Sequence, residues 1–138
     1  MKLHFFIGYD SKEDIAYRVC KYSLLKRSSI NVNVVSLKLD ELIAKNLYTR
    51  NVDPLASTQF TYSRFLVPKL MNYQGWAVFC DCDFIFLGDV SILLENLDES
   101  KAAYCVQHDY TPKEKHKMDG QKQTIYPRKN WSSFILYN

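Results

Sequence analysis

A strand–helix–strand pattern opens the chain and limits the folds that it can adopt. The apolar run Leu3–Gly8 ends in glycine, which is typical of a buried strand. Ser11 then offers a helix N-cap with Asp14 three residues later, a variant of the capping box. Residues 12–27 are predicted to form an amphipathic helix, because four apolar residues recur at helical spacing: Ile15, Val19, Tyr22 and Leu25. Residues 31–37 are rich in valine and predict a second strand, parallel to the first, with a right-handed crossover.

The rest of the chain continues the alternation of helices and strands. We expect a helix over residues 58–70, capped by Ser57 or Thr58 and ended or bent by Pro68, and then a buried strand over 76–80. The other expected elements are a short helix (39–47), a loop (48–57), a helical turn (90–97), a fourth strand (102–107), a polar loop (110–130) and a fifth strand (133–137). This order predicts a single α/β domain over residues 1–138 with a mainly parallel sheet.

Composition and charge exclude several classes of protein. The 138 residues suit one domain, and the net charge of +3 is too small to indicate nucleic-acid binding. The N-terminal apolar run is too short for a signal peptide or a membrane span. We therefore expect a cytoplasmic protein without a transmembrane segment, and peripheral attachment to the inner membrane face stays open. The four cysteines match no zinc or redox pattern and are expected to be buried, reduced thiols.

Two aspartates follow the third predicted strand directly. Asp81 and Asp83 stand at spacing i, i+2 inside an apolar segment, and in extended backbone both side chains would point to one side. Carboxylate oxygens suit a hard cation such as Mn²⁺ or Mg²⁺, and ligands of open α/β sheets bind beyond the carboxyl ends of the strands. The alternative is that the pair caps the following turn. Asp89 is expected to cap the next helix rather than to bind a ligand.

The segment from residue 60 to 90 resembles the Asp-x-Asp region of family-eight-type glycosyltransferases, which include glycogenin and bacterial lipopolysaccharide galactosyltransferases. In that family a helix with a Tyr-x-Arg pattern precedes a strand that ends in Asp-x-Asp and then Leu-Gly-Asp, as residues 61–68 and 79–90 do here. The resemblance implies a Rossmann-like three-layer α/β/α fold of the GT-A type. It also implies a nucleotide-diphosphate-sugar donor, above all a UDP-sugar, bound through a divalent metal.

Several site residues are carried over from this resemblance. Asp81 and Asp83 would be metal ligands, with Asp81 also touching the ribose, and Cys82 between them is counted among the donor-binding residues. Arg64 would organise the donor site, since arginine pairs bidentately with phosphate or carboxylate; a surface ion pair is its alternative role. Asp109, at the end of the fourth strand, is the candidate catalytic residue through contact with a sugar hydroxyl.

The first strand ends where the family places its base- and ribose-binding loop. Gly8 would let the backbone approach the ligand, Tyr9 would stack on the base, and Asp10 would accept hydrogen bonds from base or ribose. A plain strand-to-helix turn capped by Asp10 or Ser11 is the alternative. His108 is expected to be structural, and the basic loop 110–130 is expected to be mostly solvated.

Two departures from the family pattern bear on this interpretation. The chain has Trp131-Ser132-Ser133 where the family often has Asn-Ala-Gly, which puts the acceptor side in doubt. The family's third metal ligand is a histidine beyond Asn138, where this chain stops on an apolar strand. With the resemblance counted, we expect a truncated product of a longer protein, and a natural final edge strand is the alternative.

The sequence thus predicts a transferase that moves a hexose from a nucleotide diphosphate sugar to a hydroxyl acceptor, a saccharide or lipid-linked saccharide of polysaccharide biosynthesis. Activity of this length of chain alone is doubtful. A sugar nucleotidyltransferase is the first alternative, although residues 8–12 make a poor version of its glycine-rich signature. The second alternative is a non-catalytic module that binds nucleotide sugar or dimerises.

Overall fold

The computed structural model describes residues 2–108 and 129–138 and shows a mixed α/β fold. The sheet has five strands in the order β2-β1-β3-β5-β4. Their bounds are β1 Leu3–Gly8, β2 Val32–Leu37, β3 Ala77–Cys80, β4 Ala103–His108 and β5 Lys129–Tyr137. β1 pairs in parallel with both β2 and β3, whereas β5 runs antiparallel to β3 and to β4. The predicted parallel strand pair is confirmed, and the reversed β5 makes the sheet mixed.

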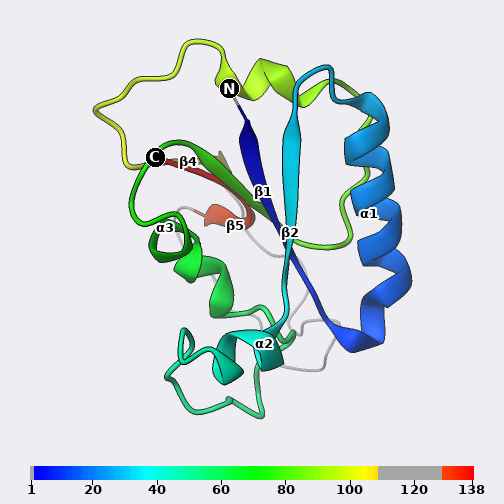
Figure 1. Cartoon of the computed structure of the whole chain (residues 1–138), viewed down its shortest axis with the longest axis vertical. Helices are drawn as coiled ribbons and strands as arrows, with labels where there is room; N and C mark the ends of the chain where they lie inside the picture. The colour runs from blue at the N-terminus through cyan, green and yellow to red at the C-terminus, as the bar shows by residue number, and fades with distance from the viewer. Residues whose placement is uncertain (1, 109–128) are drawn as a thin grey trace.

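The helices are short apart from α1, which spans Asp14–Arg27. The other helical elements are η1 (Ser11–Glu13), α2 (Leu39–Ala44), η2 (Ser63–Leu66), α3 (Val67–Leu70) and η3 (Val90–Leu94), where η marks a 3-10 helix. In Figure 1, α1 lies on one side of strands β1 and β2, and α3 lies on the other. The expected continuous helix over residues 58–70 is wrong. The segment is split into turns, η2 and α3, and Pro68 sits in the first turn of α3, where its missing N–H costs nothing.

The core is built on both faces of β1. Phe5 is fully buried, and its ring meets the rings of Phe86 at 5.5 Å and Phe134 at 6.4 Å in edge-on geometry. The alternate residue Phe6 faces the side of the sheet that carries α2 and α3, where it lines a cavity with Leu42 and Leu70. Because side chains alternate along a strand, a central strand covered on both faces must be apolar throughout. This explains the apolar residues Phe5, Phe6 and Ile7 in the middle of the strand.

The helix α1 presents the opposite face to the one that its apolar pattern indicates. Its buried residues are Cys20, Ser23 and Leu24. The apolar residues that recur at helical spacing are exposed, with exposed fractions of 77% for Ile15, 44% for Val19, 64% for Tyr22 and 47% for Leu25. Small side chains on the inner face let the helix lie close to the segment after β3: Ser23 Oγ accepts a hydrogen bond of 3.0 Å from Phe86 N.

Candidate functional site

The candidate site begins where β3 ends, at Cys80. Asp81 follows outside the strand, and its backbone N–H donates to the carbonyl of Ser133 in β5 at 2.8 Å. Residues 82 and 83 form a turn. The two aspartates therefore do not lie on extended backbone as the sequence argument assumed. β5 instead fixes the backbone at the first of them and leaves Asp83 exposed in the turn.

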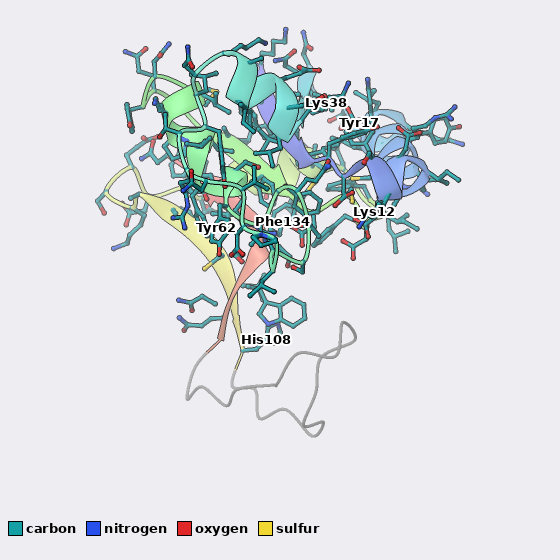
Figure 2. All side chains as sticks on the ribbon, turned by 90° about the horizontal axis from the view of Figure 1, so that it is seen from below. Lys12, Tyr17, Lys38, Tyr62, His108 and Phe134 are labelled. Carbon is teal, nitrogen blue, oxygen red and sulfur yellow. The ribbon has the colours of Figure 1, made fainter. Side chains whose placement is uncertain are left out.

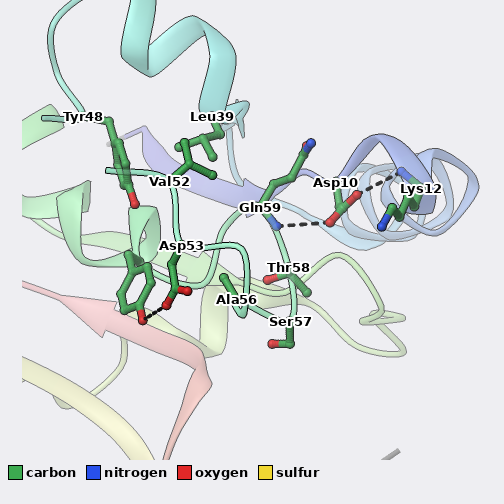
Figure 3. A pocket seen from close by; sticks show the side chains of 11 residues that line it. Asp10, Lys12, Leu39, Tyr48, Val52, Asp53, Ala56, Ser57, Thr58 and Gln59 are labelled. Carbon is green, nitrogen blue, oxygen red and sulfur yellow. Dashed lines mark hydrogen bonds between the residues drawn. The ribbon is translucent and has the colours of Figure 1, made fainter. Parts of the chain in front are cut away.

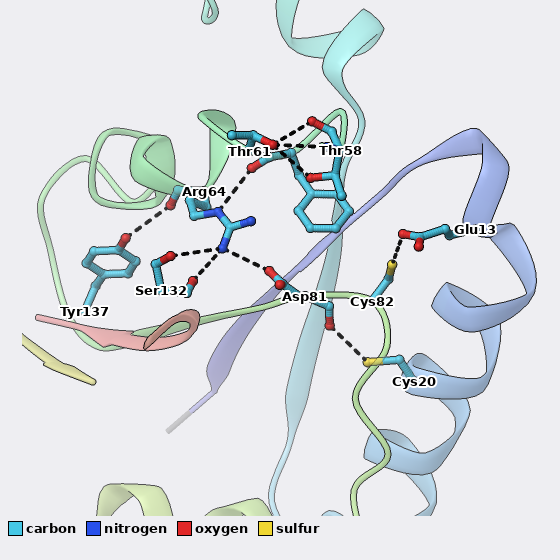
Figure 4. Close-up of polar contacts among 10 residues, drawn as sticks. Glu13, Cys20, Thr58, Thr61, Arg64, Asp81, Cys82, Ser132 and Tyr137 are labelled. Carbon is cyan, nitrogen blue, oxygen red and sulfur yellow. Dashed lines mark hydrogen bonds and ion pairs between the residues drawn. The ribbon is translucent and has the colours of Figure 1, made fainter. Parts of the chain in front are cut away.

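Asp81 is paired with Arg64, seventeen positions earlier in the chain (Figure 4). Arg64 Nη1 lies 3.1 Å from Asp81 Oδ1, with 10% of the arginine side chain and 23% of the aspartate side chain exposed. The same nitrogen donates to the Ser132 carbonyl at 2.8 Å and lies 3.3 Å from Ser132 Oγ. The pair is thus mostly buried and joins η2, the end of β3 and β5. The alternative of a surface ion pair for Arg64 is wrong.

Aromatic rings fix the direction in which Arg64 points. The guanidinium carbon lies 5.0 Å from the centroid of the Phe79 ring and 5.5 Å from that of Phe60. Arg64 Nε also approaches the Phe60 carbonyl at 3.4 Å. Cation–π contacts at this distance are favourable, and desolvation strengthens them. The arginine is therefore held in one orientation before any ligand binds.

The electrostatics of Asp81 are unusual for a surface carboxylate. Burial raises the pKa of Asp81 from its ordinary 3.8 to about 6; Arg64 lowers it, and the nearby carboxylates of Asp83 and Glu13 raise it. Although Asp81 Oδ1 lies within ion-pair distance of Arg64, the geometry makes no directed hydrogen bond, and this buried oxygen has no hydrogen-bond partner. One arginine therefore does not fully compensate the charge at this position, and a cation bound beside Asp81 would.

An open cavity of about 270 Å³ lies against the pair. It is lined by Arg64, Asp81 and four residues of β5: Asn130, Trp131, Ser132 and Ser133. Sequence reasoning did not place these β5 residues in the site. The available signal is the pair of serines at 132–133 between Trp131 and Phe134, which the sequence alone shows only as a departure from the family pattern. Five of the six lining residues are polar or charged, and the cavity has room for a phosphate-sized group.

Cys82 turns away from this cavity. Its side chain is buried, and Sγ donates to Glu13 Oε2 at 3.2 Å, which ties the turn to η1. Burial raises the pKa of the Cys82 thiol, and the hydrogen bond to Glu13 raises it further. Cys82 thus anchors the turn between the two aspartates, whereas the prediction counted it among donor-binding residues. Glu13 is a third carboxylate near Asp81 that the sequence argument did not single out.

The turn after β1 is closed by contacts within the chain. Asp10 is buried, and its carboxylate accepts hydrogen bonds from Lys12 N at 3.0 Å and Gln59 N at 3.1 Å, so it caps η1 as the alternative interpretation proposed. A methyl group on Gly8 would lie 2.6 Å from ring atoms of Phe60. The space left free by this glycine is therefore used by a side chain of the core. Approach of a ligand to the Gly8 backbone stays a prediction.

The side chain of Tyr9 also makes contacts within the chain. Its hydroxyl donates to Asp14 Oδ1 at 3.0 Å, which raises the pKa of the phenol. Its ring meets the Tyr17 ring edge-on at 5.3 Å, and Lys38 Nζ lies 5.3 Å from its centroid. Figure 2 shows Lys38 and Tyr17 near each other beside the start of α1. Stacking of Tyr9 on a base stays a prediction.

A second cavity, of about 180 Å³, opens beside Asp10 (Figure 3). Its walls come from the segment 48–62, including Tyr48, Asp53, Thr58 and Tyr62. Tyr62 donates to Asp53 Oδ2 at 2.8 Å, and Arg50 lies 4.3 Å above the Tyr62 ring. The hydrogen bond from Leu55 N, followed by that from Tyr62, lowers the pKa of Asp53. This cavity is the space nearest to the expected base-binding loop.

The remaining predicted residues fall at or beyond the end of β4. His108 is exposed, and its ring lies 4.9 Å from the ring of Trp131. Figure 2 shows His108 on the part of the β4–β5 hairpin that projects from the rest of the protein. Asp109 and residues 110–128 of the basic loop lie outside the described residues. Asp89 caps η3 as predicted, accepting from Ser91 N at 3.0 Å and Ser29 N at 3.1 Å. Hydrogen bonding to the Ser29 side chain, followed by the bond from Ser91 N, lowers the pKa of Asp89 to about 2.

Two features are absent from residues 2–108 and 129–138, namely a metal-binding group of at least three side chains and a membrane-spanning helix. These residues contain no group of three or more histidine, cysteine, aspartate or glutamate side chains placed to hold a metal ion. Their helices include none that is both long and apolar enough to cross a membrane.

Comparison with solved structures identifies a fold already known. Over 99% of its length the chain superposes on part of the bifunctional glycosyltransferase WbbM in its apo form, with a TM-score of 0.69 and 16% sequence identity. The two proteins share a fold. The chain covers 31% of that structure, and at this identity the likeness carries the fold alone.

Sequence comparison adds a much nearer relative. The chain is 56% identical over 133 residues to Protein CDI of Arabidopsis thaliana, a match that takes in 96% of the chain. It spans about half the length of that relative, 51%. No family model matches the chain.

Proposed function

We propose that the chain is the donor-binding part of a glycosyltransferase that moves a hexose from a nucleotide diphosphate sugar, above all a UDP-sugar, to a hydroxyl acceptor. The observation that supports this most is the Arg64–Asp81 pair at the carboxyl end of β3. It lies at the edge of the sheet where α/β folds bind ligands. The fold shared with a bifunctional glycosyltransferase supports the same class of reaction.

The residues fit a divalent cation, Mn²⁺ or Mg²⁺. Asp81 has a buried oxygen without a hydrogen bond, and the charge of Asp83 is near enough to raise the pKa of Asp81. Mg²⁺ and ions like it are commonly held by one or two carboxylates, with substrate phosphates completing the shell. Asp81 and Asp83 would hold the ion in this way. When bound, it would neutralise charge on the leaving diphosphate.

The protein's own groups would position the donor and stabilise charge. The Arg64 guanidinium lies over the rings of Phe60 and Phe79 and donates to the Ser132 carbonyl, so its positive charge needs no rearrangement when a phosphate enters the adjoining cavity. Preorganised charge of this kind favours the transition state over the ground state. Ser132 and Ser133, on the cavity wall, would offer further hydrogen bonds. Asp109 remains the proposed contact to the transferred sugar.

Two other functions compete with sugar transfer. A sugar nucleotidyltransferase would bind its substrate at the same edge of the sheet. In this chain, however, Asp10 caps the turn after β1, and Gly8 packs against Phe60. These contacts leave little room for a phosphate-binding loop there. A non-catalytic nucleotide-sugar-binding module would need only the metal and donor contacts. The proposed partners are a nucleotide-sugar donor and a saccharide or lipid-linked saccharide acceptor, and the proposed location is the cytoplasm.

The test is donor turnover. The chain is incubated with Mn²⁺ and a panel of nucleotide diphosphate sugars, with and without simple sugar acceptors, and released nucleoside diphosphate is measured beside an Asp81→Asn, Asp83→Asn variant. Release of nucleoside diphosphate that depends on both aspartates supports the proposal. Formation of pyrophosphate from a nucleoside triphosphate and a sugar phosphate would identify the nucleotidyltransferase instead. Donor binding with no turnover in the full-length protein would favour the binding module.

A further inference from the structure

The outward face of α1 carries an apolar row that the fold does not use. Ile15, Val19, Tyr22 and Leu25 are spaced by four, three and three residues, so they lie along one side of the helix. Between 44% and 77% of each side chain is exposed. Single exposed apolar residues are common on protein surfaces, but an ordered row on one helix indicates a contact surface.

The charges of α1 and η1 are sorted by sign. Arg18, Lys21 and Lys26 are exposed on the outer side among the apolar residues, and Lys26 Nζ lies 5.5 Å from the centroid of the Tyr22 ring. The acidic residues make contacts with the body of the protein: Glu13 accepts from Cys82 and Asp14 accepts from Tyr9. None of the ion pairs found among the described residues involves these three cations. The outer side of the helix is consequently both apolar and positively charged.

The loop after β3 lies beside α1 and exposes two further apolar side chains. Ile85 and Leu87 are 62% and 81% exposed, and they flank Phe86, whose ring is packed on Phe5 in the core. Phe86 is fastened to α1 at both backbone groups, since its N–H donates to Ser23 Oγ and its carbonyl accepts from Arg27 Nε at 2.6 Å. Two further aliphatic side chains are thereby held next to the helix by a rigid attachment.

We propose that this surface, the α1 face, docks the protein on an anionic lipid surface. The α1 face consists of the apolar residues Ile15, Val19, Tyr22 and Leu25 and the cations Arg18, Lys21 and Lys26. Interfacial helices bind membranes by burying aliphatic and aromatic side chains among the headgroups, while lysine and arginine attract anionic lipids. The face combines both features, and the acidic residues at its start, Glu13 and Asp14, accept hydrogen bonds from Cys82 and Tyr9.

A lipid surface suits the α1 face better than an acidic protein partner does. The cations are interleaved with the apolar residues along a convex helix, so a protein partner would have to supply carboxylates in a matching alternation. Lipid headgroups can rearrange laterally around each cation. The fourteen residues of α1 span about 21 Å. That length is also small for a self-contained dimer interface, which needs about 800 Å² from each partner.

Docking in this orientation would place the candidate site close to the lipid. η1 leads directly into α1, and Glu13 of η1 is hydrogen-bonded to Cys82, between Asp81 and Asp83. The start of the α1 face is therefore adjacent to the turn that carries the proposed metal ligands. The inference rests on the exposed face and its charges, and it stands whether or not the chain transfers sugar.

The experiment is co-sedimentation of the chain with vesicles of phosphatidylcholine alone or mixed with phosphatidylserine. An Arg18→Glu, Lys21→Glu variant reverses two positive charges that would attract the anionic headgroups. A Tyr22→Ser, Leu25→Ser variant removes two apolar side chains that would be buried among the lipids. The matched controls are Lys45→Glu, Lys69→Glu and Phe65→Ser, Tyr73→Ser, which change exposed residues elsewhere on the surface. All four variants should keep the wild-type circular dichroism spectrum, because every changed residue is exposed.

We expect binding to the anionic vesicles that weakens by at least about tenfold in the charge variant, since each basic residue near such a surface contributes roughly fivefold. The apolar variant should weaken as well, and neither control should. Equal weakening by the controls, or binding that ignores phosphatidylserine, would overturn the proposal. Failure of the wild type to bind anionic vesicles at low salt would also overturn it. Concentration-dependent dimerisation that is lost in the α1 variants would instead assign the face to a second copy, and capture of an acidic helical peptide would assign it to a protein partner.

Discussion

Replacing Asp81 by asparagine should stabilise the folded chain at high pH. Burial holds the pKa of Asp81 at about 6, against 3.8 when the group is in water. Because the folded-state pKa lies above the unfolded value, ionising Asp81 opposes folding. The cost is fully present above about pH 6 and disappears as the pH falls to 3.8 and below. Asparagine has nearly the shape of the protonated carboxyl and carries no charge to bury.

The size of the effect follows from the two pKa values. Their difference corresponds to a cost of about 3 kcal/mol for ionising Asp81 in the folded chain at pH values well above 6. Because only 23% of the side chain is exposed, most of this cost should apply. The loss of Arg64's counter-charge reduces the gain, although Arg64 keeps its hydrogen bond to the Ser132 carbonyl. We therefore expect the free energy of unfolding at pH 8 to rise by about 1 to 3 kcal/mol. At pH 4 the gain should fall to about 0.5 kcal/mol or less.

Urea unfolding followed by circular dichroism at pH 8 and pH 4 measures both values. Asp40→Asn is the matched control, because Asp40 is exposed and an asparagine oxygen can still accept from Glu41 N; it should change stability by no more than about 0.5 kcal/mol at either pH. A less stable Asp81→Asn protein at pH 8, or a gain that is equal at both pH values, would refute the reasoning. Either result would mean that Arg64 compensates Asp81 fully and that no charge is left for a cation to neutralise.

Two further predictions concern the packing that positions the site. Gly8→Ala should lower the free energy of unfolding by about 1 to 3 kcal/mol, because its methyl group would meet the buried Phe60 ring at 2.6 Å; in a urea-unfolding double-mutant cycle with Phe60→Leu, strictly additive costs would exclude this contact as the cause. Leu24→Ala should cost about 2 to 5 kcal/mol, whereas the adjacent Leu25→Ala should cost about 1 kcal/mol or less, because Leu24 is fully buried and Leu25 is 47% exposed. Equal costs in thermal unfolding would mean that α1 packs by its apolar row after all.

Local patterns predicted the first half of the sheet correctly. The apolar runs and the glycine at the end of β1 act within a few residues, so the sequence alone specified β1, α1, β2 and β3. The predicted capping box of Ser11 and Asp14 is wrong, because Asp10 caps η1 and α1 has no side-chain cap. The face of α1 could not be predicted in this way. Helical spacing shows that Ile15, Val19, Tyr22 and Leu25 share a side, but not that Cys20 and Ser23 on the other side fit the segment after β3.

Contacts between distant residues explain the rest of what the sequence missed. The direction of β5 depends on its pairing with β3, which lies more than fifty residues earlier. That same pairing brings Ser132 and Ser133 to Arg64 and Asp81. The strand followed by two aspartates could be recognised from sequence, and the cap at Asp10 was one of two alternatives there, whereas the cavity wall comes from tertiary structure.

Calorimetric titration of UDP into the chain, with Mn²⁺ present or removed by a chelator, tests the central claim most directly. The site described here predicts binding that requires Mn²⁺ and is lost in the Asp81→Asn, Asp83→Asn variant, whose fold is checked by the same unfolding curves. UDP binding of equal strength without the metal, or unchanged binding by the variant, would contradict the assignment of these two aspartates as metal ligands.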